Sequence, residues 1–295
     1  MAMMLDQAVS GDLAALLPKA SVEISSRGAP LAELREHFAP HTDISITFLP
    51  GDNYRHNVEV AASLRRAGFN PVPHIAAREI ASREALDDFF GRLRAEADVA
   101  RLLLIAGDVA IARGPFKSSR DLAASGLIEA HGFSRVSVAG HPEGHPWRDP
   151  AQTMKTLAVW RDWGRERQIA LDIVTQFCFE AAPILTWLVE LRTAAIDLPV
   201  MVGLAGPASP ATLMKFALRC GIGNSIRAVR NQIGRYGRLL TDTGPDEVVR
   251  GLLAAPRAAT AQIGGFHLFS FGGLRKTGNW LTSLSDTRLA RPRSG

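Results

Sequence analysis

The chain has 295 residues, of which 46% are hydrophobic and 21% are charged. This balance is typical of a globular protein with a sizeable core, and no apolar run approaches the ~20 residues that are needed to cross a bilayer. The net charge of +5 and the pI near 9.7 could suit a nucleic-acid partner, but the basic residues are dispersed among acidic ones instead of forming one stripe. We therefore expect no membrane insertion and no nucleic-acid binding.

Short apolar or β-branched runs alternate along the chain with longer segments whose apolar residues have helical spacing. The runs predict eight strands, at 21–24, 43–48, 71–75, 101–105, 135–139, 171–176, 200–204 and 266–271. Helices are predicted between them at 56–67, 83–97, 119–131, 151–167, 180–195 and 209–220.

This alternation determines the predicted fold. A helix between two strands implies a parallel crossover, and eight such units can close on themselves. We therefore predict an α/β protein with a single (β/α)8 TIM barrel domain over residues 1–295, with short extensions at both termini. An open doubly wound sheet is the alternative, but no Gly-x-Gly-x-x-Gly follows the first predicted strand.

Two segments, 161–167 and 227–238, concentrate basic residues. We interpret the second segment as a solvated helix face, and it could also bind a phosphate or a polyglutamate.

The cysteines and the N-terminus bear on the compartment. Cys178 and Cys220 have no Cys-x-x-Cys spacing and no further ligands for a metal, which predicts packing roles instead of a disulfide framework or a zinc site. Residues 1–6 lack the basic and apolar regions of a secretory signal. We therefore expect a cytoplasmic protein without a bound metal.

Polar side chains recur near the ends of the predicted strands, where a barrel places its chemistry. Glu23 is the most informative, because a carboxylate among apolar residues is costly to bury unless it is paired, protonated or catalytic. The others are Thr47, His74, Gly107-Asp108, His141, His145 and Gln176. Structural alternatives remain open: a surface salt bridge for Glu23, a turn cap for Asp108 and a core role for His74. Gln176 could bridge backbone groups.

Six short motifs occur in a fixed order along the chain. They are Val22-Glu23, Pro73-His74-Ile75, Gly107-Asp108, Ala139-x-His141-Pro-Glu-Gly-His145-Pro146, Thr175-Gln176-Phe-Cys-Phe179 and Phe266-His-Leu-Phe269. Together they resemble the methylenetetrahydrofolate reductases, and the resemblance extends from about Ser21 to Trp280. Members of that family are FAD-containing (β/α)8 barrels that reduce 5,10-methylenetetrahydrofolate to 5-methyltetrahydrofolate, with NADH or NADPH reducing the flavin first. The resemblance implies the same activity, FAD as cofactor, and folate and NAD(P)H as small-molecule partners; it leaves a homo-oligomer open.

The resemblance also implies roles for individual residues. Glu23 matches the family's general acid, which protonates the departing nitrogen when the imidazolidine ring of the substrate opens. Asp108, the second predicted catalytic residue, would influence both flavin and pterin. Gln176 and Phe216 are the predicted substrate-binding residues, although Phe216 also suits a core aromatic. The FAD contacts carried over by position are Thr47, His74, Gly107, Asp108, Ala139, His141 and His145.

The chain departs from the family pattern at four places, and the first is the strand motif Val22-Glu-Ile-Ser-Ser26, which is aromatic-rich in the family. The usual Arg-Gly-Asp reads Ala106-Gly107-Asp108, which removes a cation near the cofactor phosphates, and His141 stands where a tyrosine is usual. The usual Asn-Arg after the last strand motif is replaced by Phe271-Gly-Gly-Leu-Arg275. These departures keep two alternatives open. One is a flavin-free, folate-dependent barrel enzyme, either a methyltransferase or a lyase, and the other is a non-catalytic folate or flavin carrier. A carrier would have no need of the acid Glu23.

Overall fold

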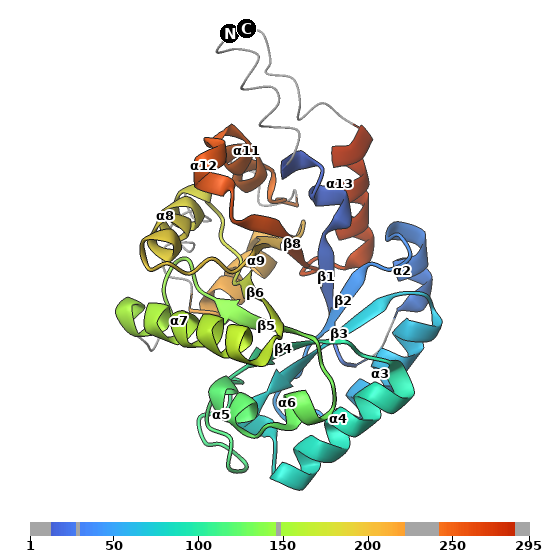
Figure 1. The fold of residues 1–295 in the computed structure, drawn as a ribbon. Helices are drawn as coiled ribbons and strands as arrows, with labels where there is room; N and C mark the ends of the chain where they lie inside the picture. The colour runs from blue at the N-terminus through green and yellow to red at the C-terminus, as the bar shows by residue number, and fades with distance from the viewer. Residues whose placement is uncertain (1–12, 28–29, 146–148, 222–241, 287–295) are drawn as a thin grey trace, which may run out of the picture. The chain divides into compact units, whose positions relative to one another are not determined.

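The structure is a computed structural model, and the residues it describes are 13–27, 30–145, 149–221 and 242–286. Eight parallel strands follow one another in chain order around a closed barrel, and at least one helix comes after each strand (Figure 1). This arrangement confirms the predicted (β/α)8 barrel. The basic segment 227–238 and the residues after 286 lie outside the described residues.

The strands agree closely with the predicted runs. They are β1 (Ser21–Ile24), β2 (Asp43–Ile46), β3 (Asn70–Ala76), β4 (Arg101–Ile105), β5 (Arg135–Gly140), β6 (Ala170–Thr175), β7 (Val200–Ala205) and β8 (Ile263–Phe269). The largest difference is β8, which begins at Ile263 instead of residue 266. Gly264 and Gly265 weaken the strand pattern in the sequence, but a Cβ at Gly264 would lie 3.1 Å from Pro199, so a glycine suits this close approach.

The helices include several that the sequence pattern did not predict. They are η1 (Leu17–Lys19), α2 (Leu31–His37), α3 (Tyr54–Arg66), η2 (Ala77–Glu79), α4 (Arg83–Ala97), α5 (Ser119–Ala124), α6 (Leu127–Ala130), α7 (Pro150–Arg167), α8 (Ala181–Thr193), α9 (Pro210–Arg219), α11 (Asp246–Ala254), α12 (Arg257–Thr260) and α13 (Leu274–Asp286). The single helix predicted over 119–131 is wrong: it is two short helices, because Gly126 adopts a φ of +72° between them.

The chain divides into two compact units, and each is described by itself. Unit 1 comprises Met1–Ala20, Gly140–Arg161 and Val174–Gly295, and unit 2 comprises Ser21–Ala139 and Asp162–Ile173. The prediction of one domain over the whole chain stays a prediction.

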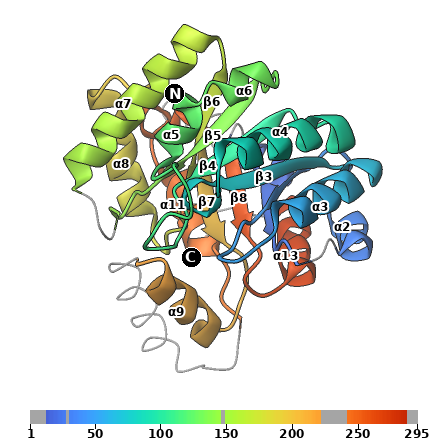
Figure 2. The ribbon, with the colours of Figure 1, turned by 90° about the horizontal axis from the view of Figure 1, so that it is seen from below.

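Unit 2 contains β1 to β4 with the helices that follow them. α3 and α4 lie side by side in both ribbon views (Figures 1 and 2). Each begins at a polar cap, because Asn53 accepts from the amide of Arg55 and Ser82 accepts from the amide of Ala85. Phe89 of α4 is fully buried, and its ring centroid lies 5.1 Å from that of Tyr54.

The amino ends of the strands in unit 2 carry a buried ion network centred on Arg101, the first residue of β4. Its Nη2 donates to both carboxylate oxygens of Asp172 at 2.8 Å, and its Nη1 donates to Asp43 at 2.7 Å. Its Nε donates to the Ser137 hydroxyl at 2.9 Å. A buried guanidinium is tolerated only with such partners. This end of unit 2 is therefore closed by paired charges.

Unit 1 contains β7 and β8, which pair in parallel register. Gly203 of β7 lies against β6: its amide donates to the Thr175 hydroxyl at 2.8 Å, and a Cβ there would lie 2.3 Å from the Thr175 carbonyl oxygen. Ser209 begins α9 by accepting from the amide of Thr212.

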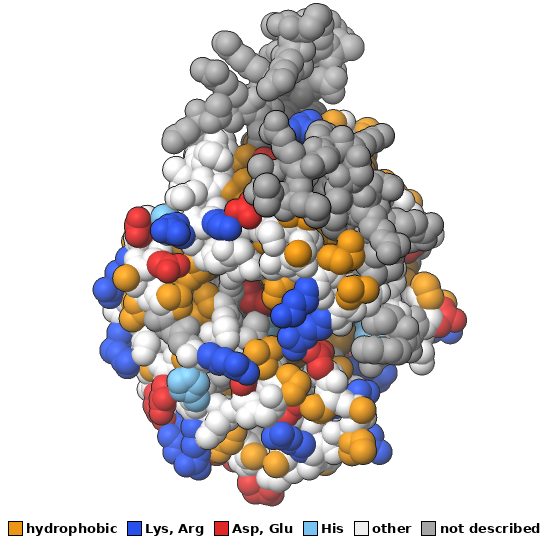
Figure 3. Space-filling model, turned by 180° about the vertical axis from the view of Figure 1, so that it is seen from behind, with side chains coloured by type: hydrophobic (Ala, Val, Ile, Leu, Met, Phe, Trp, Pro, Cys, Tyr) orange, Lys and Arg blue, Asp and Glu red, His pale blue; other side chains and the backbone are white. Residues whose placement is uncertain are grey.

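Among the described residues, no helix is both long and apolar enough to span a bilayer. On the face of the molecule in Figure 3, Lys and Arg side chains are interspersed with acidic and apolar ones.

Candidate functional site

Glu23 of β1 faces His74 of β3. The Glu23 Oε2 atom lies 3.6 Å from the His74 Nε2 atom, and the two side chains are 19% and 9% exposed. β2 runs between these strands, and its residue Ser45 pairs with Glu23 in the sheet register and is buried. A serine is small, so it leaves room for a carboxylate and an imidazole on the same face of the sheet to meet across it.

The position of Glu23 follows from strand alternation. Its neighbours Val22 and Ile24 are buried at 0% and 4% exposure, so the carboxylate lies on the opposite face of β1 from these two apolar side chains. The alternative of a surface salt bridge does not describe this geometry, because the carboxylate is partly enclosed and faces a buried histidine. The separation of 3.6 Å is longer than a hydrogen bond, so the contact between these two groups is electrostatic.

Thr47 follows β2 and is bonded to the loop after β1. Its amide donates to the carbonyl of Ile24 at 3.0 Å, and its hydroxyl accepts from the amide of Ser26 at 3.4 Å. Asp52 ties the same two loops, accepting from the Ser26 hydroxyl at 2.5 Å and from the amide of Leu49 at 2.8 Å. The loops after β1 and β2 therefore support one another at the carboxyl ends of these strands.

Gly107 and Asp108 follow β4. Gly107 has a φ of +88°, and a Cβ there would lie 3.3 Å from that of Ala76, so the position requires a glycine. Asp108 is exposed. Within the described parts of the chain its carboxylate makes no hydrogen bond or ion pair, so it does not cap the turn.

The other predicted cofactor residues lie in and after β5. Ala139 is half-buried and belongs to unit 2. In unit 1, the rings of His141 and His145 meet edge to face with centroids 4.7 Å apart, around a turn in which Gly144 has a φ of +89°.

Glu143 of the same turn reaches the thiol of Cys178. Burial raises the pKa of Cys178 well above its ordinary value, and the charge of Glu143, together with the hydrogen bond that the thiol donates to it, raises this pKa further. A thiol held in its neutral form reacts slowly, which agrees with the packing role predicted for Cys178.

Gln176 follows β6 in unit 1. Its backbone N–H donates to the carbonyl of Gly140 at 2.8 Å. Its side-chain Oε1 accepts a hydrogen bond from the backbone N–H of Phe177 at 3.1 Å. The side chain therefore does bridge to the backbone. Its Nε2 has no hydrogen-bond partner among the residues that the structure describes and is available as a donor.

Phe216 belongs to an aromatic cluster in unit 1. Its ring stacks on Phe271 with centroids 4.0 Å apart and an angle of 14° between the planes. Phe271 also meets Phe177 at 4.9 Å and Phe269 at 5.5 Å. Phe177 is buried, whereas Phe216, Phe269 and Phe271 are half-buried.

Sequence reasoning named neither Phe269 nor Phe271 as a site residue. Strand periodicity gives no signal for Phe271, because this residue lies in a turn after the end of β8. The amide of Phe271 donates to the carbonyl of Phe269 at 2.8 Å, and the two ring centroids lie 4.9 and 5.4 Å from that of Phe177, respectively.

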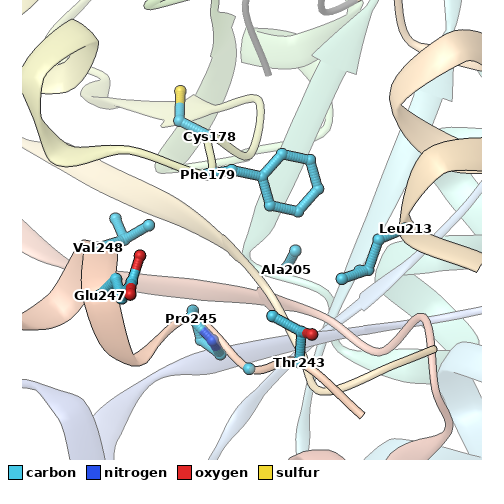
Figure 4. A pocket seen from close by; sticks show the side chains of 9 residues that line it. Cys178, Phe179, Ala205, Leu213, Thr243, Pro245, Glu247 and Val248 are labelled. Atoms are coloured by element: carbon cyan, nitrogen blue, oxygen red, sulfur yellow. The ribbon is translucent and has the colours of Figure 1, made fainter. Parts of the chain in front are cut away.

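A small cavity lies in unit 1, among side chains from the segment after β6 and from the start of α11 (Figure 4). Cys178, Phe179, Thr243 and Glu247 are among its lining residues. Its volume is about 10 Å³, which is the space of about one water molecule. It contains none of the predicted site residues and is far too small for a folate or a flavin.

In unit 2 the structure thus brings Glu23 and His74 together and places Thr47 and Gly107-Asp108 just after strands. In unit 1 it pairs His141 with His145, and it places Phe177, the neighbour of Gln176, in the aromatic cluster with Phe216. Across the described residues, no group of three or more His, Cys, Asp or Glu side chains is arranged to hold a metal ion.

No family model matches the chain. Among solved structures, the chain is similar to dihydropteroate synthase from Thermus thermophilus, with 14% identity, a TM-score of 0.47, and 91% of this chain and 93% of that chain covered. It is also similar to D-psicose 3-epimerase with D-tagatose from Clostridium cellulolyticum, with 12% identity, a TM-score of 0.37, and 79% and 96% covered. At these values the likeness says nothing of activity. The barrel is assigned from the strand order of the chain itself.

Proposed function

We propose that this protein is a flavin-dependent reductase that converts 5,10-methylenetetrahydrofolate to 5-methyltetrahydrofolate with NAD(P)H. The observation that carries the proposal is the Glu23–His74 pair, a partly enclosed carboxylate 3.6 Å from a buried imidazole near the carboxyl ends of β1 and β3. The reaction needs one acid in a partly enclosed position. Both residues lie in motifs that resemble those of the methylenetetrahydrofolate reductases.

Glu23 holds and delivers the proton. Opening the imidazolidine ring leaves negative charge on the departing nitrogen, and a carboxylic acid within reach of that nitrogen neutralises it as the bond breaks. His74 supports this role, because its Nε2 faces the Oε2 of Glu23 and could return a proton to it once the two side chains approach to hydrogen-bond distance. The Glu23 side chain is 19% exposed, so the proton-carrying group is partly enclosed.

We propose FAD as the cofactor of this reaction. The left-handed φ of Gly107 sets the turn after β4, and the exposed Asp108 that follows it has no side-chain partner among the described residues. By the resemblance, Thr47, His74, Gly107, Asp108, Ala139, His141 and His145 would hold the group. FAD, when bound, supplies the hydride chemistry that no side chain provides.

The remaining predicted residues would bind and orient the substrate. Asp108 can accept hydrogen bonds from the amino and imino groups of a pterin, and the Nε2 of Gln176 can donate to a carbonyl of the pterin or the nicotinamide. The half-buried Phe216 and Phe271 offer flat apolar surface for a planar ring.

One visible absorption spectrum of the purified protein tests the proposal. Oxidised-flavin bands that are bleached by NADH or NADPH and restored by 5,10-methylenetetrahydrofolate would support it. Folate binding without flavin bands, in protein supplied with FAD, would support a flavin-free folate enzyme instead. Flavin that nicotinamide reduces but folate does not reoxidise would exclude the proposed substrate.

A further inference from the structure

The loop after β4, residues 106–118, is fastened to the segment after β3, and we call it the β4 loop. The amide of Arg78 donates to the carbonyl of Ala106 at 3.0 Å, and the amide of Arg113 donates to the carbonyl of Arg78 at 2.8 Å. A Cβ at Gly114 would lie 2.3 Å from the carbonyl oxygen of Ala81. The β4 loop therefore lies in direct backbone contact with its neighbour, and all of these residues belong to unit 2.

The side chain of Arg78 ties the two halves of the β4 loop together. Its Nε donates to the carbonyl of Lys117 at 2.9 Å, and its Nη1 donates to the carbonyl of Val109 at 3.3 Å. These carbonyls stand on either side of the tip of the loop, where the side chain of Ile111 is 84% exposed. One half-buried guanidinium thus sets the separation of the two sides of an exposed tip.

Glu79 adds a buried charge beneath this arrangement. Its side chain is 1% exposed, and its Oε2 lies 3.2 Å from the Nε of Arg113, whose side chain is 51% exposed. Neither carboxylate oxygen of Glu79 has a further hydrogen-bond partner among the described residues. A buried carboxylate is costly without a counter-charge, so the pair favours loop conformations that keep Arg113 over Glu79.

We propose that Glu79, acting through Arg113 and together with Arg78, is a positioning residue that holds the β4 loop where it presents Gly107 and Asp108 to the ligand. The inference rests on the proposed function for the identity of that ligand. Asp108 has no side-chain partner of its own in the described parts of the chain, so its place is set by the backbone of the loop. A released loop would sample many positions, and the apparent affinity for the ligand would fall with the fraction in the competent one.

Hydrogen exchange of the free protein, followed by mass spectrometry, tests the fastening without any ligand. In Glu79→Gln, amides of residues 106–118 should exchange about ten- to a hundredfold faster, since a charge-assisted contact is lost, while amides of α3 and α4 should keep their rates. Glu59→Gln, at an exposed position of α3, is the matched control and should change neither. Unchanged exchange of the loop in Glu79→Gln would overturn the proposal.

Arg113→Gln is the second variant, because it removes the counter-charge from the exposed side of the pair and leaves the buried side chain of Glu79 in place. It should release the same loop, and Arg113→Lys, which retains the charge, should restore part of the protection. A loop that exchanges at the wild-type rate in Arg113→Gln would equally overturn the proposal.

Steady-state kinetics then separate positioning from a structural role. In the released variants, the KM for 5,10-methylenetetrahydrofolate should rise about tenfold or more with a smaller change in kcat. Faster loop exchange with an unchanged KM would refute the positioning role while leaving the proposed function intact. No turnover in the wild-type protein would instead count against the proposed function, and the exchange result would still decide whether Glu79 fastens the loop.

Discussion

The two ends of the strands in unit 2 use the same kinds of side chain in different ways. At the amino ends, Arg101 is bonded to Asp43, Asp172 and Ser137 at 2.7 to 2.9 Å. Toward the carboxyl ends, Glu23 and His74 stand 3.6 Å apart, and Asp108 makes no side-chain bond within the described residues. A charge that is fully bonded, as at Arg101, stabilises a fold, whereas an exposed carboxylate such as Asp108 can meet a ligand.

The largest effect should come from removing Arg101 at the amino ends of the strands. Arg101→Met leaves Asp43 and Asp172 without their counter-charge, and we expect the free energy of unfolding to fall by about 3 to 5 kcal/mol. Urea unfolding would measure it. Arg92→Met is the matched control, because Arg92 forms exposed ion pairs on α4 and its loss should cost less than about 1 kcal/mol. Equal losses of unfolding free energy in Arg101→Met and Arg92→Met would show that the network around Arg101 contributes no more than an exposed ion pair.

The second prediction concerns Glu23, near the carboxyl end of β1. Glu23→Gln should slow methylenetetrahydrofolate reduction by about 10² to 10⁴, because the general acid is removed, while reduction of the flavin by NAD(P)H should be spared. Stopped-flow traces of the two half-reactions would distinguish them, with Glu59→Gln as control. Folate turnover at the wild-type rate in Glu23→Gln would remove Glu23 from the chemistry.

The third prediction concerns the cation that is missing beside Gly107. Ala106→Arg should improve flavin retention by about 1.5 to 3 kcal/mol if the guanidinium forms one charge-assisted contact to a cofactor phosphate. Titration of the apoprotein with FAD measures the change, and Ala110→Arg, at an exposed position of the same loop, controls for net charge. Equal or weaker affinity in Ala106→Arg would show that other groups already hold the phosphates.

The smallest expected effect is at Asp108. A nearby anion disfavours the anionic reduced flavin and favours a cationic iminium intermediate, so Asp108→Asn should raise the reduction potential and slow folate reduction. The expected change in potential is about 30 mV, or about 1.4 kcal/mol for a two-electron couple. Potentiometric titration measures the change in reduction potential, and single-turnover kinetics measure the change in the rate of folate reduction. Asp98→Asn, at an exposed position, is the control. If neither quantity moves, Asp108 lies away from the chemistry.

The fold could be predicted from the sequence because alternation of strand and helix is a local pattern. Strands β1 and β4 and helix α4 have the predicted bounds. The positions of Glu23, His74 and Gly107 near strand ends also follow from local pattern, since a parallel barrel brings those ends to one side.

Contacts between distant residues could not be predicted in this way. Arg101 meets Asp43 and Asp172, which are 58 and 71 positions away in the chain, and only the strand register brings them together. In the same way, Glu79 pairs with Arg113 of the β4 loop, which is 34 positions away in the chain. The stack of Phe216 on Phe271 joins α9 to the end of β8.

Ser45 has a consequence for how the acid strength of Glu23 could be tuned. It touches no proposed ligand, yet its side chain, a single hydroxymethyl group, occupies the strand between the carboxylate and the imidazole. A bulkier residue at this position would increase the distance between the Glu23 carboxylate and the His74 imidazole, and this would weaken their electrostatic interaction. The proton affinity of the site is then adjustable by the volume of one uncharged side chain, without altering either of the groups that carry the proton.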